Sequence, residues 1–302
     1  MQTIVPLYGF GGGGGTGATL TVNAPAGATV TISKDGKTKT KTAGADGVAV
    51  FRGLATGRWT VTITDGEQTA QKAVTITADY STAITFFSAT IHVTYPAGST
   101  CTATDGVTTL TAPDTSGTWD CVVPNAGMWT VSTGNGFQET VEVSANGEEL
   151  TLSKWYLFNN GDTHDSITGG WDITYGRGSG TIGDVISLKT QSPSGSTYGT
   201  CALSTNNQIN LTGCKKLCFQ IVCTNTTGTA STTYRRFGYK ADGKIAFSSG
   251  STISEPTAYA VAEVDDTEVN VPVSDISGYV GGAIKTNGNG TTTEISAIWI
   301  EG

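Results

Sequence analysis

Apolar and polar residues alternate along most of this chain with the period of two that is typical of half-buried β-strands. The segment 18–35, ATLTVNAPAGATVTISKD, is representative, because leucine, valine and isoleucine alternate there with threonine and serine. Such segments are separated by turns that contain glycine or proline, and no window of the sequence has apolar residues at helical spacing. The pattern predicts an all-β protein built from sandwiches of short strands.

The same pattern occurs twice in the first half of the chain. Gly-Arg-Trp-Thr-Val at 57–61 corresponds to Gly-Met-Trp-Thr-Val at 127–131, and Pro-Ala-Gly precedes each of them. An internal repeat of this kind indicates two copies of one structural unit. We therefore expect two tandem small Ig-like sandwiches, a first module at residues 18–88 and a second module at residues 89–153.

The alignment of the two copies also assigns two cysteines. Cys101 takes the position of Val30, and Cys121 takes the position of Phe51. Both are therefore predicted to be core residues. A disulfide between them is one alternative, and a pair of buried thiols is the alternative that we favour for a reducing compartment.

Residues 154–302 contain no copy of the repeat. The strands expected there are Val185–Leu188, Cys201–Ser204, Lys216–Cys223, Tyr234–Tyr239, Lys244–Phe247, Ala258–Val264, Thr267–Pro272, Gly281–Lys285 and Thr293–Ile300. With the aromatic segment at 155–158, this number of strands predicts one jelly-roll-like sandwich. Apolar residues fall on both faces of Lys216–Cys223, which indicates a central strand covered on both sides.

The first 17 residues differ from the rest, since an apolar segment is followed by glycine at every position from 11 to 15. A glycine run of this kind is a flexible tether. Two interpretations are open for the apolar side chains: they fold back on the first module, or they dock into another subunit by strand addition. We favour docking, which makes these residues candidates for anchoring the protein to a particle: Ile4, Val5, Leu7, Tyr8 and Phe10.

Charge narrows the range of partners. The net charge is −8 and only 14% of residues are charged, which argues against nucleic acid and anionic membranes as partners. Residues 88–150 carry acids but no lysine or arginine. The sequence has no apolar run of membrane-spanning length and does not begin like a secretory signal. We therefore expect synthesis in a bacterial cytoplasm and release by another route, such as particle assembly and lysis.

Candidate catalytic and metal-binding residues are few. His164 is close in sequence to Asp162, Asp165 and Ser166, but a Ser-His-Asp triad needs groups from separated elements, and these residues belong to one loop. Asp162, Asp165 and Asp184 are candidates for a calcium site, although solvated turn acids are the interpretation that we favour. The six cysteines form no CxxC pair, so no zinc site is expected. We expect no enzyme activity and no required cofactor.

Aromatic and cationic residues of the C-terminal part are the best candidates for binding a ligand. Exposed aromatic rings stack on the apolar faces of sugars, while arginine and aspartate bind hydroxyl groups. Asp172 is a candidate partner of such rings. The alternative is that the rings pack at the ends of the sandwich. The glycan-binding candidates are Trp171, Tyr175, Arg177, Tyr198, Tyr234, Arg235, Arg236 and Tyr239.

Three stretches carry a resemblance to a known group of proteins. They are IVPLYGFGGGGG at the start, the repeated PAGATVTISKDGKTKTKT unit, and WYLFNNGD with INLTGCKKLCFQI at 209–221. Here the sequence resembles structural proteins of tailed phages and prophages of Gram-positive gut bacteria. The repeats are similar to Ig-like or PEGA-like modules, and the last domain is similar to galactose-binding-like sandwiches. The resemblance supplies no catalytic residues.

The resemblance implies a component of a virion, such as a tail, baseplate or head appendage. In this hypothesis the N-terminus binds other virion proteins, and the C-terminal sandwich binds a host-surface glycan. The first alternative is a purely structural capsid decoration or collar fibre, and the second is an enzyme that acts on polysaccharide. A homo-oligomer is expected, and a trimer is the natural choice for an appendage.

Overall fold

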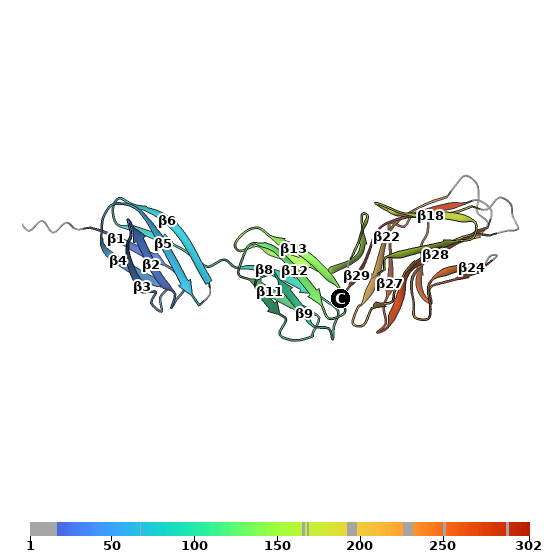
Figure 1. The fold of residues 1–302 in the computed structure, drawn as a ribbon, viewed down its shortest axis with the longest axis horizontal. Coiled ribbons are helices and arrows are strands. Elements are labelled where there is room, and N and C mark those ends of the chain that lie inside the picture. Colours follow the sequence, from blue (N-terminus) through green and yellow to red (C-terminus); the bar gives the residue numbers. More distant parts are fainter. Residues whose placement is uncertain are drawn as a thin grey trace, which may run out of the picture. The chain divides into compact units, whose positions relative to one another are not determined.

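The computed structural model describes residues 17–66, 68–164, 167, 169–191, 198–225, 232–249, 252–287 and 290–302 (Figure 1). The described residues form strands and no helix. The chain divides into two compact units, Met1–Ser88 and Ala89–Gly302. The all-β class predicted from the sequence, with two small Ig-like sandwiches before a larger jelly-roll-like sandwich, is confirmed. The predicted anchoring residues Ile4 to Phe10 lie outside the described residues.

The first module is a sandwich of two sheets with strand orders β4-β1-β7 and β3-β2-β5-β6. Strand β1 pairs antiparallel with β4 and parallel with β7. Alternate residues from the two sheets, such as Leu20, Ile32 and Val61, are fully buried between them. The strands are β1 (Ala18–Asn23), β2 (Thr29–Lys34), β3 (Lys37–Thr42), β4 (Val48–Leu54), β5 (Gly57–Asp65), β6 (Gln68–Ile76) and β7 (Tyr80–Ala83).

The second module repeats this topology, with strand orders β11-β8-β14 and β10-β9-β12-β13. The tryptophan of each repeat makes the same contact, since the Trp59 indole N–H donates to the Ala55 carbonyl at 2.9 Å and that of Trp129 to the Asn125 carbonyl at 3.1 Å. Its strands are β8 (Ala89–Thr94), β9 (Cys101–Thr104), β10 (Thr109–Thr111), β11 (Thr118–Val123), β12 (Gly127–Thr133), β13 (Gln138–Val143) and β14 (Glu149–Leu152).

Cys101 and Cys121 lie in the core of the second module, as the repeat alignment predicts, and both are free thiols. Cys121 is opposite Ile91 in the same way that Phe51 is opposite Leu20 in the first module. Burial raises the pKa of the Cys101 thiol to about 11 and that of the Cys121 thiol to about 12. Both thiols therefore act as small apolar side chains.

The C-terminal sandwich has two large sheets. One consists of β15 (Lys154–Asn159), β16 (Asp162–Thr163), β18 (Gly178–Ile182), β19 (Ile186–Thr190), β22 (Lys216–Asn225), β27 (Glu268–Pro272) and β29 (Thr291–Glu301). The other consists of β17 (Trp171–Tyr175), β20 (Tyr198–Thr205), β28 (Ser277–Asn287), β23 (Thr232–Lys240) and β26 (Ala258–Val261), with β21 (Ile209–Asn210) beside β28. The rings of Phe219 and Phe237 meet between them with centroids 5.4 Å apart.

Each strand expected in this part has a counterpart in the structure. Within the described part of the chain, five strands are additional: β16, β17, β18, β21 and β25 (Thr252–Ser254). Strand β22 is central, because it pairs with both β27 and β29. The prediction that both of its faces are covered is only partly correct. Cys218 is buried with Trp299 and Tyr156, whereas Val222 on the same face is 57% exposed.

The second module and the C-terminal sandwich pack directly on each other within the second unit. The Trp155 indole N–H donates to the Thr94 carbonyl at 2.9 Å, and the Ala97 N–H donates to the Gly213 carbonyl at 3.2 Å. Glu139 of β13 accepts the Tyr156 N–H at 2.7 Å. Burial raises the pKa of the Glu139 carboxyl group. These contacts explain why the two parts form one compact unit.

Candidate functional site

Strand β23 carries aromatic and cationic residues on alternating faces. Successive side chains of a strand point to opposite sides of the sheet. Arg235, Phe237 and Tyr239 therefore face the interior, and Tyr234 and Arg236 face the outside of the sandwich. The burial of Phe237 and the partial exposure of Arg236 agree with this alternation.

The outward side chains of β23 form a stacked cluster with the neighbouring edge strand β26. The guanidinium carbon of Arg236 lies 4.5 Å from the ring centroid of Tyr234 and 4.6 Å from that of Tyr259. The Arg236 guanidinium and the Tyr234 hydroxyl both donate to the carboxylate of Glu255. A planar cation between two rings is a favourable cation–π arrangement. The cluster therefore holds its side chains in fixed orientations.

A second aromatic–cation pair continues the cluster across β28 and β20. Tyr234 pairs with Lys285 in the register of β23 and β28. The Lys285 ammonium in turn lies 4.5 Å from the ring centroid of Tyr198. Tyr198, Tyr234, Arg236, Glu255, Tyr259 and Lys285 together make up what we call the aromatic face.

The electrostatics of the aromatic face favour neutral hydrogen-bonding groups. Burial and the neighbouring Glu255 raise the pKa of the Tyr234 hydroxyl, so it remains protonated at neutral pH. Glu255 and Arg236 compensate each other in charge. The face thus offers ring surfaces and a hydrogen-bonded ion pair, and it carries the additional positive charge of Lys285.

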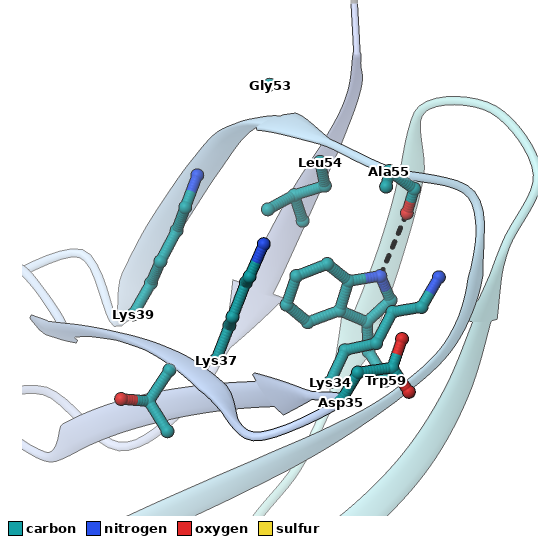
Figure 2. Close-up of a pocket in the computed structure, with 9 residues that line it drawn as sticks. Lys34, Asp35, Lys37, Lys39, Gly53, Leu54, Ala55 and Trp59 are labelled. Carbon is teal, nitrogen blue, oxygen red and sulfur yellow. Dashed lines mark hydrogen bonds between the residues drawn. The ribbon is translucent and has the colours of Figure 1, made fainter.

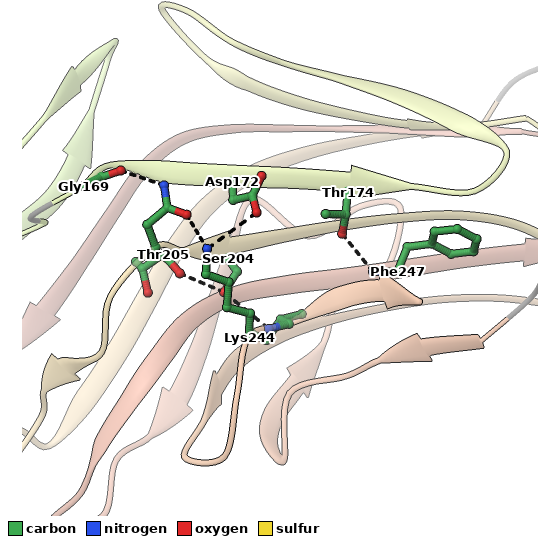
Figure 3. Close-up of polar contacts among 9 residues, drawn as sticks. Gly169, Asp172, Thr174, Ser204, Thr205, Lys244 and Phe247 are labelled. Carbon is green, nitrogen blue, oxygen red and sulfur yellow. Dashed lines mark hydrogen bonds and ion pairs between the residues drawn. The ribbon is translucent and has the colours of Figure 1, made fainter. Parts of the chain in front are cut away.

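A hairpin formed by β24 (Ala246–Ser249) and β25 (Thr252–Ser254) covers the middle of this sheet. Figure 3 shows the polar contacts that hold it. The Lys244 ammonium binds Asn206 and lies 3.6 Å from the Asp172 carboxylate, and the Phe247 N–H donates to Thr174 at 2.8 Å. The hairpin is therefore fixed over β17 and β20. The open part of the face is on β26, where Tyr259 is 41% exposed.

Three of the glycan-binding candidates belong to the core instead. Trp171, Arg235 and Tyr239 are 8%, 3% and 3% exposed. The Arg235 guanidinium donates to Asn225 at 2.7 Å and to Thr291 at 2.6 Å, and the Tyr239 hydroxyl lies 3.0 Å from that of Ser274. The polar groups of Arg235 and Tyr239 thus serve contacts within the protein, and burial removes all three side chains from a surface site.

The other candidates divide between two places. Tyr198, Tyr234 and Arg236 come together on the aromatic face. Tyr175 is exposed near the end of β17, on the side of that strand that faces the other sheet. Arg177 follows in the turn to β18, where its carbonyl accepts the Gln191 N–H at 3.1 Å. Tyr175 and Arg177 are thus separate from the aromatic face.

The acidic candidates do not form a metal site in the part of the chain that the structure describes. Asp162 and Asp184 are both exposed, and they are brought near each other because Asp184 lies against Gly161. Asp165 is outside the described residues. Among those described, no three His, Cys, Asp or Glu side chains gather closely enough to hold a metal ion.

Sequence reasoning missed Glu255, Tyr259 and Lys285. The sequence of β23 did contain one indication of the aromatic face. Phe237 is expected in the core, and alternation along the strand then directs Arg235 inward and both Tyr234 and Arg236 outward. The pairing of β23 with β26 and β28 joins segments distant in the sequence, and no local pattern reports it.

Comparisons with known proteins leave the chain without an assigned family. No protein-family model and no curated protein match the sequence. Among solved structures, one of β-sandwich carbohydrate-binding modules shares 14% identity, covering 82% of this chain and 93% of that one, with a TM-score of 0.32. The Bacillus anthracis TIE protein shares 11% identity over 88% of this chain and 48% of its own, with a TM-score of 0.21. A Ca²⁺-stabilised ice-binding adhesin of an Antarctic bacterium shares 13% identity over 90% of this chain and 74% of its own, with a TM-score of 0.14.

Similarity at these scores carries no argument about what this protein binds. The site is therefore defined by the geometry of the aromatic face alone. In the described portion, no helix has the length and apolar character needed to cross a membrane.

Proposed function

We propose that the C-terminal sandwich is a non-enzymatic carbohydrate-binding module and that the aromatic face is its binding surface. The observation that carries this proposal is the stack of Tyr234, Arg236 and Tyr259 with Glu255 beneath its polar groups. Sugars present apolar C–H faces and a rim of hydroxyl groups. A half-exposed ring beside a fixed guanidinium–carboxylate pair matches both features.

Each group has a role in this proposal. The exposed Tyr259 ring packs on the C–H face of a sugar, while Arg236 donates to hydroxyl oxygens and Glu255 accepts from hydroxyl groups. Arg236 is already ordered by the two rings and the carboxylate before a ligand arrives. Little side-chain entropy is then lost on binding, which favours affinity from a small contact area.

Adjacent acids occur at Glu148–Glu149 and at Asp265–Asp266, and the contacts of one member of each pair support a binding role rather than hydrolysis. Glu148 accepts the N–H groups of Ser144 at 2.7 Å and Ala145 at 3.0 Å, and Asp266 accepts the Glu263 N–H at 2.7 Å. These carboxylates close turns. A glycosidase instead directs two carboxylates at one glycosidic bond.

A glycan array probed with the full chain tests the proposal. We expect a restricted set of glycans to be retained, and we expect Tyr259→Ala to weaken their binding by about tenfold or more, as loss of an aromatic anchor does. Tyr80→Ala is the matched control, because Tyr80 is equally exposed (43%, against 41% for Tyr259) but lies in the first module. If no glycan is retained, or if Tyr259→Ala binds as well as the unchanged protein, the proposal is wrong. A purely structural protein without a ligand is then the better explanation.

We also propose that the protein is a component of a tailed-phage particle, anchored by its N-terminal segment. The support is the sequence resemblance and the glycine tether at 11–15. Deleting residues 1–17 should abolish incorporation into particles, which mass spectrometry of purified particles measures. Normal incorporation of the shortened chain would refute the anchoring role, and absence of the full chain from particles would refute the virion role.

A further inference from the structure

The first module has a pocket of about 590 Å³ at the edge of its sandwich, between β3 and β4. Figure 2 shows Lys37 and Lys39 standing over it, with the Trp59 indole and Leu54 behind them. The lining residues are Lys34, Asp35, Lys37, Thr38, Lys39, Gly53, Leu54, Ala55 and Trp59. The pocket thus combines an apolar inner wall with a cationic rim.

The strand register explains why lysines face this pocket. Lys39 lies opposite Ile32, and Lys41 lies opposite Val30, in the antiparallel pairing of β2 and β3. Residues directly opposite each other share one face of a sheet. Ile32 and Val30 are core residues, so the lysines of β3 point to the interior side of the sandwich edge. The alternating threonines take the other side.

The positive charge of this edge is largely uncompensated. The Lys39 ammonium donates to the Arg52 carbonyl at 3.2 Å, and the Lys34 ammonium donates to the Thr56 carbonyl. Both acceptors are neutral. Within the described residues these lysines form no ion pair, and the one carboxylate in the lining is that of Asp35. An anionic ligand would supply the missing charge.

Inward-pointing lysines on an edge strand have a simpler explanation, since they prevent edge-to-edge aggregation. The second module tests that explanation within the same chain. Its equivalent edge strand β10 is shorter, with three paired residues against six in β3, and Thr108, Leu110 and Ala112 take the positions of Lys37, Lys39 and Lys41. The same scaffold therefore keeps an edge strand without any lysine. The scaffold itself does not require lysine at this edge, and edge protection does not explain why Lys37 and Lys39 also line a pocket.

The pocket and the row of Lys37, Lys39 and Lys41 on β3 together make up what we call the lysine groove. We propose that the lysine groove binds an extended anionic glycan or polyol polymer. Alternate residues of a strand are about 7 Å apart, so Lys37, Lys39 and Lys41 follow one another at this spacing on one side of β3. A linear polymer with one phosphate or carboxylate per repeat can pair with this row. Its backbone then lies against Leu54 and the open Gly53, where no side chain obstructs the wall.

The lysine groove goes beyond the function proposed for the C-terminal sandwich, and the two sites lie in different compact units. They also differ in chemistry, because the aromatic face takes a sugar by stacking and the groove takes a polymer by charge. Either site can be lost without affecting the other.

Binding of the full chain to three polymers tests the proposal: poly(glycerol phosphate), polygalacturonate and neutral dextran. We expect binding to at least one of the two anionic polymers, weakening as salt is added, and none to dextran. The double variant K37T/K39L, which installs the residues of the second module, should bind about tenfold or more weakly. The phosphate and carboxylate arms identify which anion is preferred.

The control is R58T/K72T, which also removes two positive charges from the first module, but at sites away from the groove. Arg58 is on the outer face of β5, and Lys72 is on the opposite edge strand β6. Its binding should stay within about twofold of the unchanged protein. An equal loss in both variants, equal binding to dextran, or no binding to either anionic polymer would overturn the proposal. Unchanged thermal unfolding of both variants excludes misfolding as the cause.

Discussion

Cysteine and arginine side chains, which are common in active and binding sites, are core residues at several positions of this protein. All six cysteines are buried and free, and burial raises the pKa of Cys201, Cys214 and Cys218 to about 12. A thiol reacts as its thiolate, so these groups are inert in the folded chain. Arg235 is likewise a core residue, held by Asn225 and Thr291.

Burial of the six thiols predicts that they react slowly in the native chain. The native chain should react with an aromatic disulfide reagent at pH 8 only at the rate of unfolding, and six thiols should appear at once in guanidinium chloride. Release of thiolate chromophore, followed at its absorption maximum, measures both. Fast stoichiometric reaction of the native chain, or fewer than six thiols after unfolding without reductant, would contradict the burial described here.

Glu139 predicts how stability depends on pH. Its pKa is raised in the folded state by burial, so between the ordinary and the raised value the folded chain binds more protons than the unfolded chain. Stability contributed by this group is therefore lost as pH rises through that window. Glu139→Gln removes the titration and keeps an acceptor for the Tyr156 N–H. The Tm of the variant minus the Tm of the unchanged protein should therefore increase as the pH rises from 4 to 7. The increase should be about 2–4 °C for each kcal/mol of stability that the unchanged protein loses through Glu139. A constant difference in Tm across this range would contradict the account.

Strands are the scale at which the sequence was most informative. Alternation located strands such as β19 and β27 because every second residue of them is buried. Strands β20 and β28 are instead buried at most of their positions. It missed β18, whose residues 178–182 are glycine, serine and threonine with one terminal isoleucine. It also gave no reason to expect β3, since all six of its residues are exposed and pairing with β2 makes it a strand. The aromatic face could be predicted only in part. The alternation of side chains within β23 is a local pattern, whereas the pairing of β23 with β26 joins segments that are distant in the sequence.

Gly213 predicts the importance of the contact between the second module and the C-terminal sandwich. A Cβ on this residue would lie 2.0 Å from the Ala97 carbonyl oxygen, and its φ is 77°. Gly243 has nearly the same φ, 75°, but its Cβ would meet nothing within 4 Å. Gly243→Ala should cost about 1–2 kcal/mol from left-handed strain alone. Gly213→Ala should cost clearly more, which urea unfolding measures; equal losses would show that the contact is loose.

The whole molecule consists of two compact units, each with its own hydrophobic core. The boundary at residues 88 and 89 falls between the two repeats, so the second module belongs with the sandwich that follows it. Repetition in the sequence therefore identifies related structural units but does not show which of them pack together. That depends on junction residues such as Trp155, whose partner Thr94 is in the preceding module.

Separate cores predict separate unfolding. Ile63 and Leu217 are fully buried, one in each unit. Replacing either with alanine removes about 2–5 kcal/mol of stability from its own unit. In calorimetry of the full chain, Ile63→Ala should lower one transition and Leu217→Ala the other. A single transition that both substitutions lower together would contradict the division into independent units.

Carbohydrate binding by the aromatic face of the C-terminal sandwich is the function that we propose for this molecule. Hydrogen exchange of the full chain, measured by mass spectrometry with and without a saccharide retained on the array, tests it most directly. We expect the ligand to slow exchange in peptides that contain β23 and β26, with little change in peptides of the second module. Protection that leaves β23 and β26 unaffected and falls elsewhere in the chain would contradict this proposal.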